Sequence, residues 1–163
     1  MSLDDALSLT REEIVKNHKE YLNTALVQLQ SLIDFTRNFV RAEGTKVWDD
    51  EGNEYLDFLG AYGALNLGHN PPKVMEALQK AWGKPNLLQA ALSPLPAALA
   101  HNLAQVTPGN LKHTFFCNSG AEAVEGALKL VRIATGKEAV IYCKGAFHGK
   151  SFGALSVTGR EKY

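Results

Sequence analysis

Apolar side chains recur at helical spacing near the start of the chain. The positions that follow the 3.6-residue period are Leu22, Ala25, Leu26, Leu29 and Ile33. A capping-box pattern precedes them, with Thr10 three positions before Glu13. The spacing predicts one long amphipathic helix over about residues 11–35, and its apolar stripe needs a partner surface.

The next pattern is typical of a small antiparallel sheet. Residues 39–58 contain β-favouring runs at 47–48 and 55–58, separated by turn signals at 43–44 and 49–53. We expect three short strands there. The glycine-rich residues 60–69 have no strict period and predict a loop, in which His69 is expected to be a hydrogen-bonding anchor and not a catalyst.

Two further helices are predicted in the middle of the chain. Pro71 and Pro72 open the first, which runs to about Trp82 and is followed by Gly83. Its inward face is expected to carry Val74, Leu78, Ala81 and Trp82. The second covers residues 94–106, and residues 84–93 between them are expected to be irregular.

Residues 114–150 predict a strand, a tight turn, a helix and a second strand. The strands are expected at 115–117 and 139–143, both apolar enough to be covered on two faces. Ser119 and Glu122 form a capping-box pattern at the start of the helix, and Gly136 ends it.

Such a unit exposes the first N–H groups of its helix, where the helix dipole favours an anion. Ser119, Gly120 and Ala121 are therefore candidates for a phosphate seat. The alternative is an ordinary capped helix that binds nothing. Residues 145–150 follow the second strand at the same sheet edge and include Phe147, so a ligand with a phosphate ester and a planar ring is favoured.

Composition narrows the classes of partner. The chain has 163 residues, 45% of them hydrophobic, and a formal net charge of zero, which suggests a compact domain without a nucleic-acid or membrane partner. No signal segment is evident, so a cytoplasmic protein is expected. Cys117 and Cys143 are expected to be buried reduced thiols, and no spacing predicts a metal site.

Residues 115–125 (FFCNSGAEAVE) and 145–151 (GAFHGKS) together resemble the class III, fold-type I aminotransferases that use pyridoxal phosphate. The similarity runs from about residue 39 to 163 and is strongest to putrescine aminotransferases, then to ornithine aminotransferases. It implies an α/β fold. Residues 1–69 would be the N-terminal helix and β-meander of the small domain, and 70–163 the beginning of the large, mostly parallel cofactor domain.

The resemblance also implies residue roles. Ser119, Gly120 and Ala121 would hold the cofactor phosphate, Phe147 would stack on the pyridine ring, and His148 would lie beside it. No residue of the chain corresponds to the family's Schiff-base lysine, which is expected beyond the last residue. The chain is accordingly expected to be an inactive N-terminal fragment of a homodimeric enzyme.

Two residues are implied to meet the substrate. Tyr62 falls where ornithine enzymes carry a substrate-contacting tyrosine. Lys150 stands where many relatives have an arginine that clamps a carboxylate, and a lysine keeps only a point charge. The donor is therefore expected to be a diamine or ω-amino acid of the putrescine or ornithine type, with a 2-oxo acid as acceptor.

Two alternatives stay open. One is a pyridoxal-phosphate aminomutase or racemase of the same fold, which needs no 2-oxo acid. The other is a non-catalytic module that binds phosphate and dimerises through residues 11–35. The stripe on those residues suits packing on its own domain as well as packing across a dimer.

Overall fold

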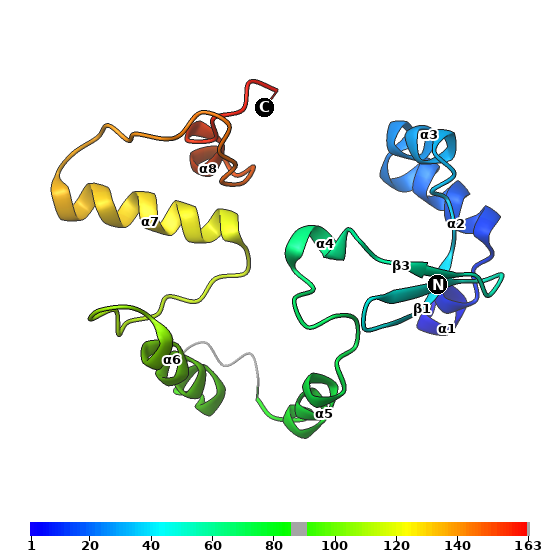
Figure 1. The fold of residues 1–163 in the computed structure, drawn as a ribbon, viewed down its shortest axis with the longest axis horizontal. Helices are drawn as coiled ribbons and strands as arrows, with labels where there is room; N and C mark the ends of the chain where they lie inside the picture. The colour runs from blue at the N-terminus through cyan, green and yellow to red at the C-terminus, as the bar shows by residue number, and fades with distance from the viewer. Residues whose placement is uncertain (86–90, 163) are drawn as a thin grey trace. The chain divides into compact units, whose positions relative to one another are not determined.

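The computed structural model describes residues 1–85 and 91–162 and divides into two compact units, Met1–Lys84 and Pro85–Tyr163 (Figure 1). The division expected from the sequence, 1–69 and 70–163, concerns domains of a larger fold and stays a prediction. Among the described residues, no helix is long and apolar enough to cross a membrane.

The first unit begins with short helices where one long helix was expected. They are α1 (Leu3–Leu7), α2 (Arg11–Asn17), the π-helix η1 (His18–Leu22) and α3 (Thr24–Leu32). The predicted cap at Thr10 is confirmed, since its side chain accepts from the Glu13 N–H. The continuous helix is wrong. The backbone is extended at Asn23 (φ −154°), whose side chain caps α3 by accepting from Leu26.

The predicted apolar stripe does not form the core of this unit. Leu22, Leu29 and Ile33 are each more than half exposed, whereas Val27 is 5% exposed. The break at Asn23 changes which face of α3 is covered, because a helix restarted after a non-helical residue has a new rotational phase. Helix α1 was not predicted, although Ser2 and Asp5 form a complete capping box.

The predicted antiparallel meander is confirmed. Strands β1 (Phe39–Glu43), β2 (Lys46–Asp49) and β3 (Glu54–Leu56) form one sheet in the order β1-β2-β3. Gly44 makes the first turn with φ +56°. The same residue pairs with His69, which ties the far end of the following loop to the sheet.

The segment after the sheet is a loop with one tight turn. The four residues of α4 (Gly60–Gly63) include Ala61 and Tyr62 in the left-handed region, so this is no regular helix. Helix α5 (Pro72–Ala81) follows as predicted. Its expected inward face is exposed, however, with Leu78 54% and Trp82 81% accessible.

The second unit contains α6 (Pro94–Val106), α7 (Gly120–Thr135) and α8 (Phe152–Ser156) (Figure 1). Its buried apolar side chains among the described residues are Ala154 and Val157. Residues 86–90, part of the segment expected to be irregular, lie outside the described residues.

The two strands expected beside α7 are not formed. Residues 115–117 and 139–143 do not form strands, and Ile141 is 99% exposed. A buried parallel strand needs neighbours on both edges and covers on both faces. The described residues supply neither. For the same reason Cys117 and Cys143 are free but exposed, which corrects the expectation that they are buried.

Candidate functional site

The predicted phosphate seat is the N-terminus of α7. Ser119 is its N-cap, with extended backbone, and its hydroxyl accepts from the Glu122 N–H at 3.2 Å. The Glu122 carboxylate accepts from the N–H of Asn118 at 2.6 Å, not from that of the N-cap, so the expected capping box is only half formed. Gly136 ends the helix in the left-handed region, as predicted.

The start of α7 has the features that an anion requires. The N–H groups of Gly120 and Ala121 have no hydrogen-bond partner among residues 1–85 and 91–162. A Cβ built on Gly120 would meet nothing within 4 Å, so the space in front of this turn is open. Two aligned donors at the positive end of a 16-residue helix fit a phosphate group.

The second motif lies directly against this helix. Gly149 has φ +120°, and a Cβ placed on it would come within 2.7 Å of the Ala121 Cβ. The loop that carries Phe147 and His148 therefore packs on the first turn of α7. Only glycine allows this approach, since any side chain at position 149 would collide.

The two ring-bearing residues of this loop are partly accessible. Phe147 is 49% exposed, which leaves ring surface available to a planar ligand. The N–H of His148 donates to the Thr158 hydroxyl at 3.2 Å, so the backbone of the loop is fixed from the residues after α8. Lys150 is exposed and belongs to the same loop.

Glu125 is a residue of this region to which the sequence analysis gave no role. It lies on α7 one turn after Ala121, and its Oε1 accepts from the N–H groups of Gly153 (2.7 Å) and Ala154 (3.1 Å). In the sequence, Glu125 is recognisable only as a carboxylate next to the apolar face of a predicted helix. Its partner could not be identified from that signal because it lies 28 residues away.

The surroundings of Glu125 favour its ionised form. The Ser151 hydroxyl and the N–H groups of Ala154 and Gly153 hold the pKa of Glu125 below its ordinary value, against the opposing effect of desolvation. The Ser151 hydroxyl oxygen is buried, and no described residue lies in hydrogen-bonding geometry with it. The two backbone donors are therefore the directional contacts of the carboxylate.

Tyr62, the other predicted substrate residue, belongs to the first unit. Its side chain is 92% exposed, and its backbone is left-handed with φ +56°. A non-glycine residue in this region is uncommon and costs on the order of 1 kcal/mol. The loop around Tyr62 is held by Asp57, whose Oδ1 accepts from the N–H groups of Leu59 and Gly60.

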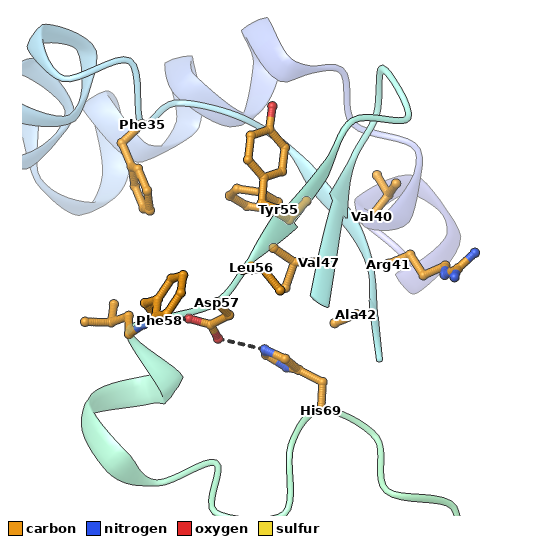
Figure 2. A pocket seen from close by; sticks show the side chains of 12 residues that line it. Phe35, Val40, Arg41, Ala42, Val47, Tyr55, Leu56, Asp57, Phe58 and His69 are labelled. Atoms are coloured by element: carbon orange, nitrogen blue, oxygen red, sulfur yellow. Dashed lines mark hydrogen bonds and ion pairs between the residues drawn. The ribbon is translucent and has the colours of Figure 1, made fainter. Parts of the chain in front are cut away.

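Beside this loop is an apolar cavity of about 620 Å³. Figure 2 shows it bordered by the sheet and by side chains that include Phe35, Val47, Leu56 and Phe58. Its polar end is the contact between His69 Nε2 and Asp57 Oδ2, at 2.8 Å. His69 was predicted to anchor the loop, and this contact confirms it.

The contact between Asp57 and His69 has a structural role. The backbone N–H of Gly60 and the His69 ring hold the pKa of Asp57 below its ordinary value. A carboxylate that already accepts two backbone donors and an imidazole is a turn cap, with little capacity left for a ligand. No group of three or more His, Cys, Asp or Glu residues suited to a metal occurs in the described parts of the chain.

Comparison with known proteins is consistent across sequence and structure. A family model for class III aminotransferases matches residues 30–163. The chain is 42% identical over 157 residues to the aminotransferase PigE of a Serratia species. It is 41% identical over 172 aligned positions to a putrescine aminotransferase of Pectobacterium atrosepticum. These alignments cover 94% and 100% of this chain, but only 18% and 36% of the two relatives.

Two solved structures share the fold over most of the chain. An (S)-enantioselective ω-transaminase from Thermomicrobium roseum matches with a TM-score of 0.82 and 29% identity, over 95% of this chain and 37% of that one. A taurine:2-oxoglutarate aminotransferase from Bifidobacterium kashiwanohense, solved with PLP and glutamate, matches with a TM-score of 0.79 and 28% identity, over 95% and 34%.

Proposed function

The chain belongs to the class III aminotransferases, and we propose that it is the N-terminal part of an enzyme that transfers an amino group from a diamine or ω-amino acid to a 2-oxo acid. Its fold is that of a fold-type I transferase, as the sequence predicted. The observation that carries the proposal is the close approach of Gly149 to Ala121, which brings the two family motifs to one helix end.

The cofactor of this proposal is pyridoxal 5′-phosphate. Ser119, Gly120 and Ala121 would hold its phosphate, since the open turn at Gly120 and the two available N–H groups fit that group. Phe147 would cover one face of the ring, and His148 would lie at its side. When bound, the cofactor withdraws electrons from the carbon that bears the amino group.

The remaining task of this chain's residues is to orient the substrate. Lys150 offers a point charge where a bidentate guanidinium would grip a carboxylate more firmly, which favours a donor without an α-carboxylate. Tyr62 would contribute to the substrate pocket through its exposed side chain. The 41% identity to a putrescine aminotransferase supports the same donor class.

The lysine that binds the cofactor covalently is proposed to lie outside these 163 residues, because none of the twelve lysines present matches its family position. The chain by itself is therefore proposed to be inactive. The whole enzyme is proposed to be a cytoplasmic homodimer. A non-catalytic phosphate-binding module remains the second candidate, and the N–H groups of Gly120 and Ala121, which have no partner among the described residues, favour it equally well.

Donor screening of the protein encoded by the complete reading frame tests the proposal. We expect turnover with putrescine or ω-amino acids and a 2-oxo acid, measured as the amino acid formed. Lys150→Arg is expected to shift the ratio of kcat/KM toward carboxylate-bearing donors by on the order of tenfold, because it restores the bidentate fork. Activity confined to α-amino groups would contradict the donor class. Product without any 2-oxo acid would indicate the aminomutase.

A further inference from the structure

The N-terminus of α8 is capped by a side chain from a different helix. Its N-cap residue, Ser151, makes no side-chain capping bond. The N–H groups of Gly153 and Ala154 instead donate to Glu125 on α7, at 2.7 and 3.1 Å. Because the first N–H groups of any helix need outside acceptors, this carboxylate fixes where α8 begins relative to α7.

The contact is close enough to restrict the sequence of α8. A Cβ built on Gly153 would overlap the Glu125 carboxylate, so a side chain there would displace the carboxylate from its present position. Ala154, the next residue, is 0% exposed. The most completely buried side chain described in this unit therefore lies at the place where α7 and α8 meet.

The far end of α8 is bonded to the loop that carries Phe147 and His148. The Thr158 hydroxyl accepts from the His148 N–H at 3.2 Å and donates to the Ala154 carbonyl oxygen at 2.9 Å. A movement of α8 would therefore pull on the loop directly.

A second connection reinforces the first. Gly159 is joined to the start of the loop by two hydrogen bonds: the Gly145 N–H donates to the Gly159 carbonyl oxygen at 2.7 Å, and the Gly159 N–H donates to the Ala146 carbonyl oxygen at 3.0 Å. The other end of the loop rests on α7 through Gly149 and Ala121. The loop is thus held between α8 and the first turn of α7.

From these contacts we propose that Glu125 is a positioning residue: by holding the start of α8 on α7, it sets where Phe147 and His148 lie relative to the N–H groups of Gly120 and Ala121. The inference rests on the proposed function, in which those groups hold opposite ends of one cofactor. The Glu125 carboxylate makes its hydrogen bonds to Gly153 and Ala154, not to the residues proposed to hold the phosphate or the ring. Its effect is transmitted through α8 and Thr158.

Three substitutions separate position from charge in the protein encoded by the complete reading frame. Glu125→Ala removes the cap, and Glu125→Asp keeps the charge but shortens its reach by one methylene. Glu125→Gln keeps an acceptor oxygen at the same distance. Glu161→Gln changes an exposed glutamate of the same unit and serves as the control.

Two readouts are needed: amide hydrogen exchange at Gly153 and Ala154 without cofactor, and the dissociation constant for pyridoxal phosphate by fluorescence. We expect faster exchange and about tenfold weaker cofactor binding for Glu125→Ala and Glu125→Asp. Glu125→Gln should stay within about threefold of the wild type, because its amide oxygen still accepts both N–H groups. Glu161→Gln should match the wild type in both readouts.

Unchanged cofactor affinity in Glu125→Asp and Glu125→Ala would overturn the inference, and so would a loss in Glu125→Gln as large as in Glu125→Ala. If Glu125→Ala fails to fold, the comparison of Glu125→Asp with Glu125→Gln is enough to test the inference. A wild-type protein that binds no pyridoxal phosphate would overturn the proposed function itself. The exchange data distinguish the two cases, since they report the Glu125 contact without any cofactor.

Discussion

Asp49 is the buried charged residue of the described structure, with 2% of its surface exposed. It is the last residue of β2, before the turn to β3, and it accepts from the side chain of Asn53, the hydroxyl of Tyr55 and the guanidinium of Arg37. The N–H groups of Glu51 and Asn53 also donate to it. The carboxylate therefore holds the hairpin turn together.

The pH dependence of stability should follow from this cluster. Desolvation raises the pKa of Asp49, but hydrogen bonds from Asn53, Tyr55 and Arg37 outweigh it and hold the pKa well below the ordinary 3.8. Because the folded pKa is depressed, the stabilisation is complete above the unfolded value and is lost as the pH falls through the folded one.

We therefore expect the wild type to be more stable than Asp49→Asn at pH 6, with a difference that shrinks as the pH falls below about 3.8. Urea unfolding at several pH values measures it. Asp50→Asn, which alters the exposed neighbour, is the matched control and should show no such trend. A pH-independent difference would contradict the role of the charge.

At the scale of elements, the two ends of α7 depend on glycine for different reasons. Gly136 needs its left-handed φ of +65° but has open space around it, whereas Gly149 has both a positive φ and the Ala121 Cβ in the way. The first position is restricted by the backbone alone. The second is restricted by packing as well.

Replacing Gly136 or Gly149 with alanine should therefore destabilise the protein to different extents. Gly136→Ala should lower the free energy of unfolding by about 1 kcal/mol, the cost of a left-handed alanine. Gly149→Ala should cost about 1–3 kcal/mol more, because the new methyl group must displace the loop or α7. Chemical denaturation measures both. Equal effects of the two changes would show that the contact with Ala121 imposes no constraint.

For the whole molecule, the main feature is how little apolar surface the described residues cover. Their buried apolar side chains are Val27, Ala154 and Val157, while residues such as Phe58, Phe115 and Ile141 are at least 80% exposed. Extensive exposed apolar surface marks an interface or a liability to associate.

The isolated 163-residue chain is therefore expected to bind a hydrophobic dye and to sediment as species heavier than one chain. It is also expected to show no transamination, because the family's Schiff-base lysine is proposed to lie outside these residues. Sedimentation velocity and an amino-transfer assay on the pure chain test both points. A monodisperse monomer without dye binding would contradict the first, and measurable turnover would contradict the second.

Local signals in the sequence determined the ends of the helices and the small sheet. The caps at Thr10, Ser119 and Gly136 and the meander over residues 39–58 were all predicted, because each depends on residues a few positions apart. The anchoring role of His69 was also predicted. Its partner Asp57 lies only 12 residues away.

What depends on distant partners was decided by the tertiary structure alone. The apolar runs at 115–117 and 139–143 have strand-like sequences but pair with no strand in the described parts of the chain. The break at Asn23 is local by contrast, since its side chain accepts from Leu26, three positions on. The contact of Glu125 with Gly153 and Ala154 joins residues 28 and 29 positions apart. Periodicity reports which residues are apolar along one element, but the surface that covers them is supplied by other parts of the fold.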